Sequence, residues 1–169
     1  MLAKGLVNSL IFGNEEILKI LKKFENLDLR SIQPAGIDLR VKRVLKVKGN
    51  AFLGKEKRKM PEIEKVFEKG KVLLKKNEFV LVETEEKVKM SKKLAGIILP
   101  RSSLSRSGIA LLTSFVDPGF KGSLTVGMKN LGNGDFEIEI GARFAQLILF
   151  EVKGCSKLYR GRYQGGKVI

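Results

Sequence analysis

Residues 95–152 decide the fold of this chain, and they read AGIILPRSSLSRSGIALLTSFVDPGFKGSLTVGMKNLGNGDFEIEIGARFAQLILFEV. Short runs rich in Ile, Leu, Val and Phe are separated here by Gly, Pro, Asn, Asp and Ser. Apolar runs of this length, bounded by such residues, are typical of β-strands. We therefore predict strands over residues 95–99, 109–115, 122–129, 135–140 and 145–152.

The residues before this stretch predict one helix and further strands. Residues 14–24 have the spacing of an amphipathic helix, with Asn14 as N-cap. Its predicted apolar face consists of Ile17, Leu18, Leu21 and Phe24. Apolar and charged residues alternate over residues 37–47, and apolar runs at 71–74 and 78–84 also predict strands. The Lys/Glu-rich residues 48–71 predict a long polar excursion with room for a short helix.

Many short strands and one helix favour an all-β fold, a distorted jelly roll or β-barrel with a short N-terminal helix. At 169 residues, of which 43% are hydrophobic, we expect one domain over residues 1–169. It would include an N-terminal helical segment (1–30), the Lys/Glu-rich excursion (48–71) and a flexible C-terminal flap (159–169).

The composition excludes several classes of catalyst. The chain has no histidine and a single cysteine, Cys155, so a Ser-His-Asp triad and a zinc site are both excluded. The formal net charge of +15 suits an anionic ligand. The Lys residues are scattered among Glu and there is no Trp, which argues against nucleic acid as the main ligand. No apolar run reaches the roughly 20 residues of a membrane span, so we expect a cytoplasmic protein without a membrane partner.

Two polar segments hold the candidate site. Residues 100–108, PRSSLSRSG, place two guanidinium groups beside several hydroxyl groups. Residues 116–122, VDPGFKG, then present the carboxylate of Asp117 on a turn. Hydrogen-bond donors for an anion and a nearby carboxylate are suited to holding or attacking a phosphorylated nucleotide.

Five segments in order resemble the dUTPase and dCTP deaminase superfamily. They are AGIDLR (35–40), PRSSL (100–104), SFVDPGFKG (114–122), GARFAQL (141–147) and the Gly-rich tail that starts at Tyr159. The resemblance implies a dUTPase-like fold and a homotrimer whose active sites form at subunit junctions. It also implies Mg²⁺ bound to the phosphates of a deoxynucleoside triphosphate, with no metal site made by the protein itself. One branch deaminates dCTP, another hydrolyses dUTP, and some members do both.

Gly127 separates these branches. In deaminases of this superfamily, the strand after the Asp-Pro-Gly turn carries a glutamate that transfers protons, and the matching position here is Gly127. Because glycine cannot transfer a proton, the resemblance implies a dUTP diphosphatase, which converts dUTP to dUMP and pyrophosphate. Two alternatives stay open: a dCTP deaminase, monofunctional or bifunctional, and a non-catalytic deoxynucleotide-binding regulator.

The resemblance also assigns roles to single residues. Asp117 would activate the attacking water, and Phe120 would stack under the deoxyribose, although a core position is an alternative for Phe120. Thr125 and Val126 would read the base through the strand backbone. Asp38 would support the site or touch the substrate. The phosphates would be bound by Arg101, Ser102, Ser103, Arg106 and Gln146.

The tail YRGRYQGGK (159–167) resembles the ending of the deaminases more than that of the hydrolases. Its glycines and cations predict a disordered terminus or a flexible flap that closes over the nucleotide. We expect Tyr159, Arg162 and Gln164 to bind substrate from this flap.

Overall fold

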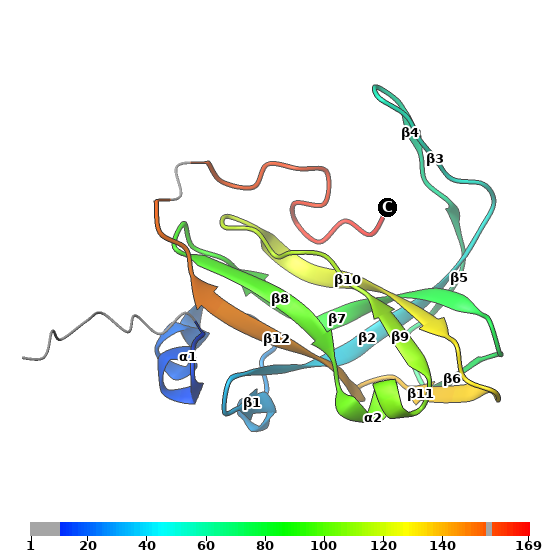
Figure 1. The fold of residues 1–169 in the computed structure, drawn as a ribbon, viewed down its shortest axis with the longest axis horizontal. Coiled ribbons are helices and arrows are strands. Elements are labelled where there is room, and N and C mark those ends of the chain that lie inside the picture. The colour runs from blue at the N-terminus through cyan, green and yellow to red at the C-terminus, as the bar shows by residue number, and fades with distance from the viewer. Residues whose placement is uncertain (1–10, 155–156) are drawn as a thin grey trace, which may run out of the picture.

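The computed structural model of the chain describes residues 11–154 and 157–169. It confirms the predicted fold class, because the chain is mostly β and forms a nearly closed, barrel-like sheet (Figure 1). The helices are α1 (Asn14–Ile20) and α2 (Ser102–Arg106), with 3₁₀ turns at Leu21–Lys23 and Leu29–Ser31. No helix in this part of the chain has the length and apolar character that a membrane span requires.

The main sheet has the strand order β8-β12-β2-β7-β10-β9, and β1 and β5 also pair with β2. Two small sheets pair β11 with β6 and β3 with β4. The strands are β1 (Ile32–Gln33), β2 (Gly36–Lys48), β3 (Phe52–Leu53), β4 (Arg58–Lys59), β5 (Glu62–Phe67), β6 (Lys71–Leu74), β7 (Phe79–Lys89), β8 (Leu94–Pro100), β9 (Ile109–Leu112), β10 (Lys121–Asn130), β11 (Phe136–Glu139) and β12 (Arg143–Glu151).

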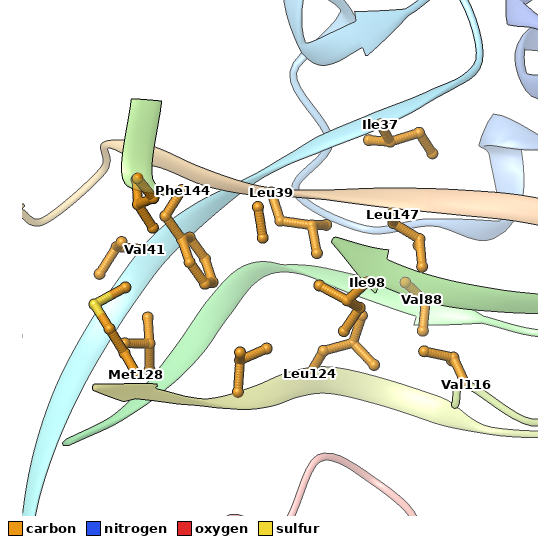
Figure 2. Packing of buried hydrophobic residues seen from close by; sticks show 14 of the residues in the cluster. Ile37, Leu39, Val41, Val88, Ile98, Val116, Leu124, Met128, Phe144 and Leu147 are labelled. Atoms are coloured by element: carbon orange, nitrogen blue, oxygen red, sulfur yellow. The ribbon is translucent and has the colours of Figure 1, made fainter. Parts of the chain in front are cut away.

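The core lies inside the curved sheet and follows the two-residue period of the strands. On β10, Leu124, Val126 and Met128 are buried, whereas Thr125 and Lys129 are half-buried on the other face. Figure 2 shows the side chains that meet in the core from β2 and β12, namely Ile37, Leu39, Val41, Phe144 and Leu147. Since β2 and β12 are direct neighbours in the sheet, the core also fixes the strands that carry Asp38 and Gln146.

The N-terminal helix is shorter than predicted. Helix α1 ends at Ile20, and its first residue is Asn14 rather than an N-cap, because Ile17 N donates to Gly13 O at 3.0 Å. Ile17 is fully buried and Phe24 nearly so, but Leu18 is exposed, so its place on the apolar face is wrong. A 3₁₀ turn, Leu21–Lys23, directly follows Ile20.

The Lys/Glu-rich excursion contains no helix; it forms strands β3, β4 and β5. Strands β3 and β4 make a hairpin that projects from the sheet (Figure 1), and β5 pairs with the end of β2. Strand β5 was not predicted because its sequence is highly charged. Most of β5 is exposed, and an exposed edge strand needs few apolar residues.

Several boundaries also differ from the predicted ones. Strand β7 continues to Lys89, and β9 stops at Leu112 instead of residue 115. Helix α2 was not predicted; buried Leu104 anchors it between β8 and β9. Cys155 and the first ten residues of the predicted N-terminal segment lie outside the described residues.

Candidate functional site

Most of the predicted site residues lie at two different places on the sheet, and each place defines a group of residues. The first group, called the arginine cluster, consists of Asp38, Arg101, Arg143 and Gln146. The second group lines a cavity around Asp117, called the Asp117 cavity.

The arginine cluster is organised by the buried carboxylate of Asp38. Its Oδ2 lies 3.6 Å from Arg101 Nε and 3.8 Å from Arg143 Nη1. Asp38 is almost fully buried on β2, while both arginine side chains are part-exposed. One carboxylate thus faces two guanidinium groups, which leaves an excess positive charge at the surface, suited to an anion.

The backbone brings these residues together. Gln146 on β12 stands opposite Asp38 on β2 and opposite Leu99 on β8, two residues before Arg101. Arg101 N donates to Phe144 O at 3.1 Å, which ties the start of α2 to β12. Gly36 leaves space for Gln146, because a Cβ at position 36 would lie 2.9 Å from Gln146 Cγ. The AGIDLR, PRSSL and GARFAQL segments therefore meet at neighbouring strands.

The serines of this region are displayed at the start of α2. Ser102 and Ser103 are exposed there, next to Arg101, and Arg106 is exposed at the end of the same helix. Sequence reasoning missed Arg143 as a member of the cluster, although it lies within GARFAQL. The ion pair with Asp38 across two strands is the signal that identifies it.

The Asp117 cavity has a volume of about 400 Å³. Among the predicted site residues, Asp117, Phe120, Thr125 and Tyr159 line it. The ring of Phe120 is nearly buried and packs edge-on against Tyr159, with 5.6 Å between ring centroids. Thr125 Oγ1 is buried without a hydrogen-bond partner among the described residues. These four residues thus bring together an exposed carboxylate, two aromatic rings and a hydroxyl group without a hydrogen-bond partner.

Other lining residues were not predicted from the sequence. Met60 lines the cavity from the segment between β4 and β5, and Leu81 lines it from β7. Tyr163 and Lys167 line it from the tail. Met60 lies in a polar segment with no recognisable pattern, so no sequence signal pointed to it. Lys167 adds a cation to the cavity that holds Asp117.

Three further predicted substrate-binding residues, Val126, Arg162 and Gln164, are not among the residues that line the Asp117 cavity. The Val126 side chain is fully buried in the core, on the opposite face of β10 from Thr125. Arg162 is exposed and does not line the cavity. The side-chain amide of Gln164 is hydrogen-bonded to the backbone of Lys121 and Gly119.

The two groups of residues do not share one cavity within a single chain. Val116, next to Asp117, forms an isolated bridge with Gly96 on β8, whereas Arg101 follows the other end of β8. At about 3.3 Å per residue, some 13 Å of strand separate Gly96 from Pro100. None of Arg101, Ser102, Ser103, Arg106 and Gln146 lines the Asp117 cavity.

Gly127 lies on the same face of β10 as Thr125 and is enclosed by apolar side chains. It pairs with Leu81 and with Leu112 on its two sides. A Cβ at position 127 would lie 2.9 Å from Phe79 Cε2 and 3.1 Å from Leu112 Cβ. The space that a side chain at this position would need is therefore occupied.

Comparison with known protein families gives a match over most of the chain. A family model described as dCTP deaminase-like matches residues 11–152. The dCTP deaminase of Pyrococcus furiosus is 38% identical over 136 residues, which cover 80% of each chain. The probable deoxyuridine 5′-triphosphate nucleotidohydrolase of Methanothermobacter thermautotrophicus is 32% identical over 155 residues, covering 92% of this chain and 99% of the relative.

Solved structures show the same fold at low sequence identity. A 2′-deoxycytidine 5′-triphosphate deaminase from Agrobacterium tumefaciens superposes with a TM-score of 0.70 at 16% identity over 85% of this chain. The match spans 48% of that longer chain. A dUTPase mutant of Staphylococcus bacteriophage 80alpha, solved with dUpNHpp, has a TM-score of 0.52 at 16% identity and covers 82% of this chain and 95% of its own.

Proposed function

The chain belongs to the dCTP deaminase-like family, within the dUTPase and dCTP deaminase superfamily, and on this premise we propose that it is a dUTP diphosphatase. Some of the similar proteins are named dCTP deaminases and others deoxyuridine 5′-triphosphate nucleotidohydrolases. The choice between the two activities therefore depends on the residues of this chain. The observation that carries the proposal is Gly127. At the position expected for the deaminase glutamate there is no side chain, and Phe79 and Leu112 fill the adjacent space.

Asp117 has the properties required of the base that activates water. It is the one carboxylate among the described residues that line the cavity, and it is exposed there. Hydrolysis between the α- and β-phosphates needs one such base together with positioning and charge neutralisation. Deamination of cytosine needs protons delivered to the ring as well, and Gly127 cannot deliver them.

The cavity walls suit a deoxynucleoside. Phe120 and Tyr159 offer apolar surface for the sugar, and the unpaired hydroxyl of Thr125 gains a partner when a pyrimidine edge lies near it. The hydroxyl group can donate or accept, so it suits uracil without excluding cytosine. The choice between dUTP hydrolysis and dCTP deamination then depends on position 127, where this chain has glycine instead of the deaminase glutamate.

The arginine cluster is proposed to hold the phosphates. A base acting on the α-phosphorus and the donors that bind the phosphates must surround the same groups. Because the Asp117 cavity and the arginine cluster are separate within one subunit, we propose that one subunit supplies Asp117 and another supplies Arg101, Ser102, Ser103 and Gln146. This arrangement supports the homotrimer expected from the resemblance; the trimer, the single-domain organisation and the cytoplasmic location stay predictions.

Mg²⁺ is expected to reach the site on the triphosphate. Among the described residues, no group of three acidic or cysteine side chains could ligate a metal by itself. The ion would neutralise phosphate charge, and the chain's own contribution would be Asp117 on the water and the guanidinium groups on the phosphate oxygens.

Product analysis tests the proposal directly. The protein is incubated with Mg²⁺ and either dUTP or dCTP, and the nucleotides are separated by chromatography. We expect dUMP and pyrophosphate from dUTP, and no uracil nucleotide from dCTP. Uracil nucleotides from dCTP would assign the chain to the deaminases, and no conversion of either substrate would favour the nucleotide-binding regulator.

A further inference from the structure

The Asp117 turn, defined as residues 117–122, has few hydrogen bonds of its own. Phe120 N donates to Asp117 O at 3.2 Å. The loop after β7 adds two bonds through Met90, whose O accepts from Gly119 N at 3.2 Å and whose N donates to Phe120 O at 2.8 Å. Neither the turn itself nor the loop after β7 provides a hydrogen-bond donor for the carbonyl groups of Pro118 and Gly119.

Gln164, in the C-terminal tail (residues 157–169), fits this turn with its side-chain amide. Its Oε1 accepts from Lys121 N at 2.9 Å, and its Nε2 donates to Gly119 O at 2.9 Å. The same Nε2 lies 3.3 Å from Tyr159 O. A neutral amide has both an acceptor and two donors, so it suits an N–H and two carbonyl groups at once.

The tail backbone completes the contact on either side of Gln164. Tyr159 N donates to Pro118 O, and Gly165 N donates to Lys121 O, each at 2.8 Å. With the two Gln164 bonds, the tail thus provides four partners for backbone groups of the turn. Figure 1 shows the tail (orange to red) folded back alongside the end of the barrel.

Two glycines of the turn allow the tail to approach. Gly119 and Gly122 have φ values of +88° and +126°, which favour glycine. A Cβ at Gly119 would lie 2.7 Å from Leu158 Cβ, and a Cβ at Gly122 would lie 2.5 Å from the carbonyl carbon of Gly165. The glycines of VDPGFKG are therefore needed for the tail as well as for the turn itself.

From this geometry we infer that Gln164 is a positioning residue for the proposed hydrolysis, holding the turn that carries Asp117 rather than binding the nucleotide. The inference depends on the proposed function, because it assigns Gln164 an effect on the catalytic base. A base displaced by 1 Å can lose about 10²-fold in rate. Two of the three hydrogen bonds of the Gln164 side chain go to this turn, so their loss should let Asp117 move and lower turnover.

The test replaces Gln164 with Met, which has similar length but no amide, and with Glu, which can still accept from Lys121 N but places an anion against Gly119 O. The matched control is Glu56→Met in the exposed turn between β3 and β4. Three quantities are measured in the full-length protein: hydrogen exchange of the Lys121 amide by NMR, kcat and KM for dUTP with Mg²⁺, and the melting temperature.

We expect the Lys121 amide of Gln164→Met to exchange about 10-fold faster. We also expect kcat to fall about 10-fold while KM changes less than about 3-fold. Gln164→Glu should fall between wild type and Gln164→Met, and Glu56→Met should match wild type in all three measurements. A raised KM with unchanged kcat would overturn the inference and return Gln164 to nucleotide binding, and unchanged exchange would overturn it as well. If the wild type does not hydrolyse dUTP, the proposed function fails, whereas the exchange data still decide whether Gln164 holds the turn.

Discussion

Asp38 Oδ2 lies 3.6 Å from Arg101 Nε, so a buried carboxylate on β2 restrains an arginine that follows β8. The same oxygen faces Arg143 at 3.8 Å. Both distances are too long for a hydrogen bond, and Asp38 Oδ2 has no hydrogen-bond partner among the described residues. The carboxylate therefore acts by charge, holding two guanidinium groups side by side at the surface.

Replacing Asp38 with Asn should weaken phosphate binding. The amide keeps the shape of the side chain but removes the charge between the guanidinium groups, which then repel each other. We expect KM for dUTP to rise about 10-fold or more and the free energy of unfolding to fall by about 1–3 kcal/mol. Steady-state kinetics and urea unfolding measure the two effects. Normal KM would show that the cluster does not contact the nucleotide.

Replacing Asp117 with Asn should abolish hydrolysis without loss of binding. The amide keeps the size and most hydrogen bonds of the carboxylate but cannot take a proton. We expect kcat to fall by about 10²-fold or more. Calorimetry with dUTP should give an affinity close to that of the wild type. Near-normal turnover by this variant would remove Asp117 from the role of base.

Replacing Gly127 should lower the stability of the protein without creating deaminase activity. A Cβ at this position would lie 2.9 Å from the ring of Phe79, so Gly127→Ala should lower the free energy of unfolding by about 1–3 kcal/mol. The added variant Phe79→Leu should recover part of this loss in a double-mutant cycle. Gly127→Glu is not expected to produce uracil nucleotides from dCTP. Additive losses in the cycle would show that Phe79 does not restrict this position.

Deleting residues 159–169 should reduce turnover severely while the oligomer persists. The last strand, β12, ends at Glu151, so the sheet does not need the tail. The deletion removes Tyr159, Tyr163 and Lys167 from the cavity wall and frees the backbone of the Asp117 turn. Sedimentation of the truncated protein beside its dUTP turnover checks both expectations. Normal turnover would make the tail dispensable, and monomers would make it part of the assembly.

Glu78 should contribute to stability near neutral pH and lose this contribution in acid. Burial raises the pKa of its carboxyl, but the hydrogen bonds from Lys46 and from Lys75 N outweigh burial and hold the pKa below its usual 4.5. The folded pKa is lower than the unfolded one, so the stabilisation is present above about pH 4.5 and disappears as the pH falls through the folded pKa. Glu78→Gln should unfold with a weaker pH dependence below pH 5 in denaturant titrations. An unchanged slope would contradict the assignment.

The sequence alone was sufficient for the all-β class and for most strands. Apolar runs between turn residues recovered the positions of β6, β8, β10 and β12 with errors of two residues or fewer, because their burial depends on local alternation. It also pointed to the family, because five separated segments retain residue types that side-chain chemistry demands. Strand β5 and helix α2 were not predicted, because their sequences are polar. Strand β5 depends on its pairing with β2, and helix α2 depends on one buried leucine.

Only the tertiary structure divided the predicted site residues between the arginine cluster and the Asp117 cavity. Spacing along the chain contains no information on which ends of strands meet, since that depends on the strand order and on the register of β2, β8 and β12. The sequence likewise could not show that Gln164 forms hydrogen bonds with the Asp117 turn, because its partners there are backbone groups that every residue has. Residue type determined which chemistry is available to this protein; packing of the backbone decided which of these groups can act together.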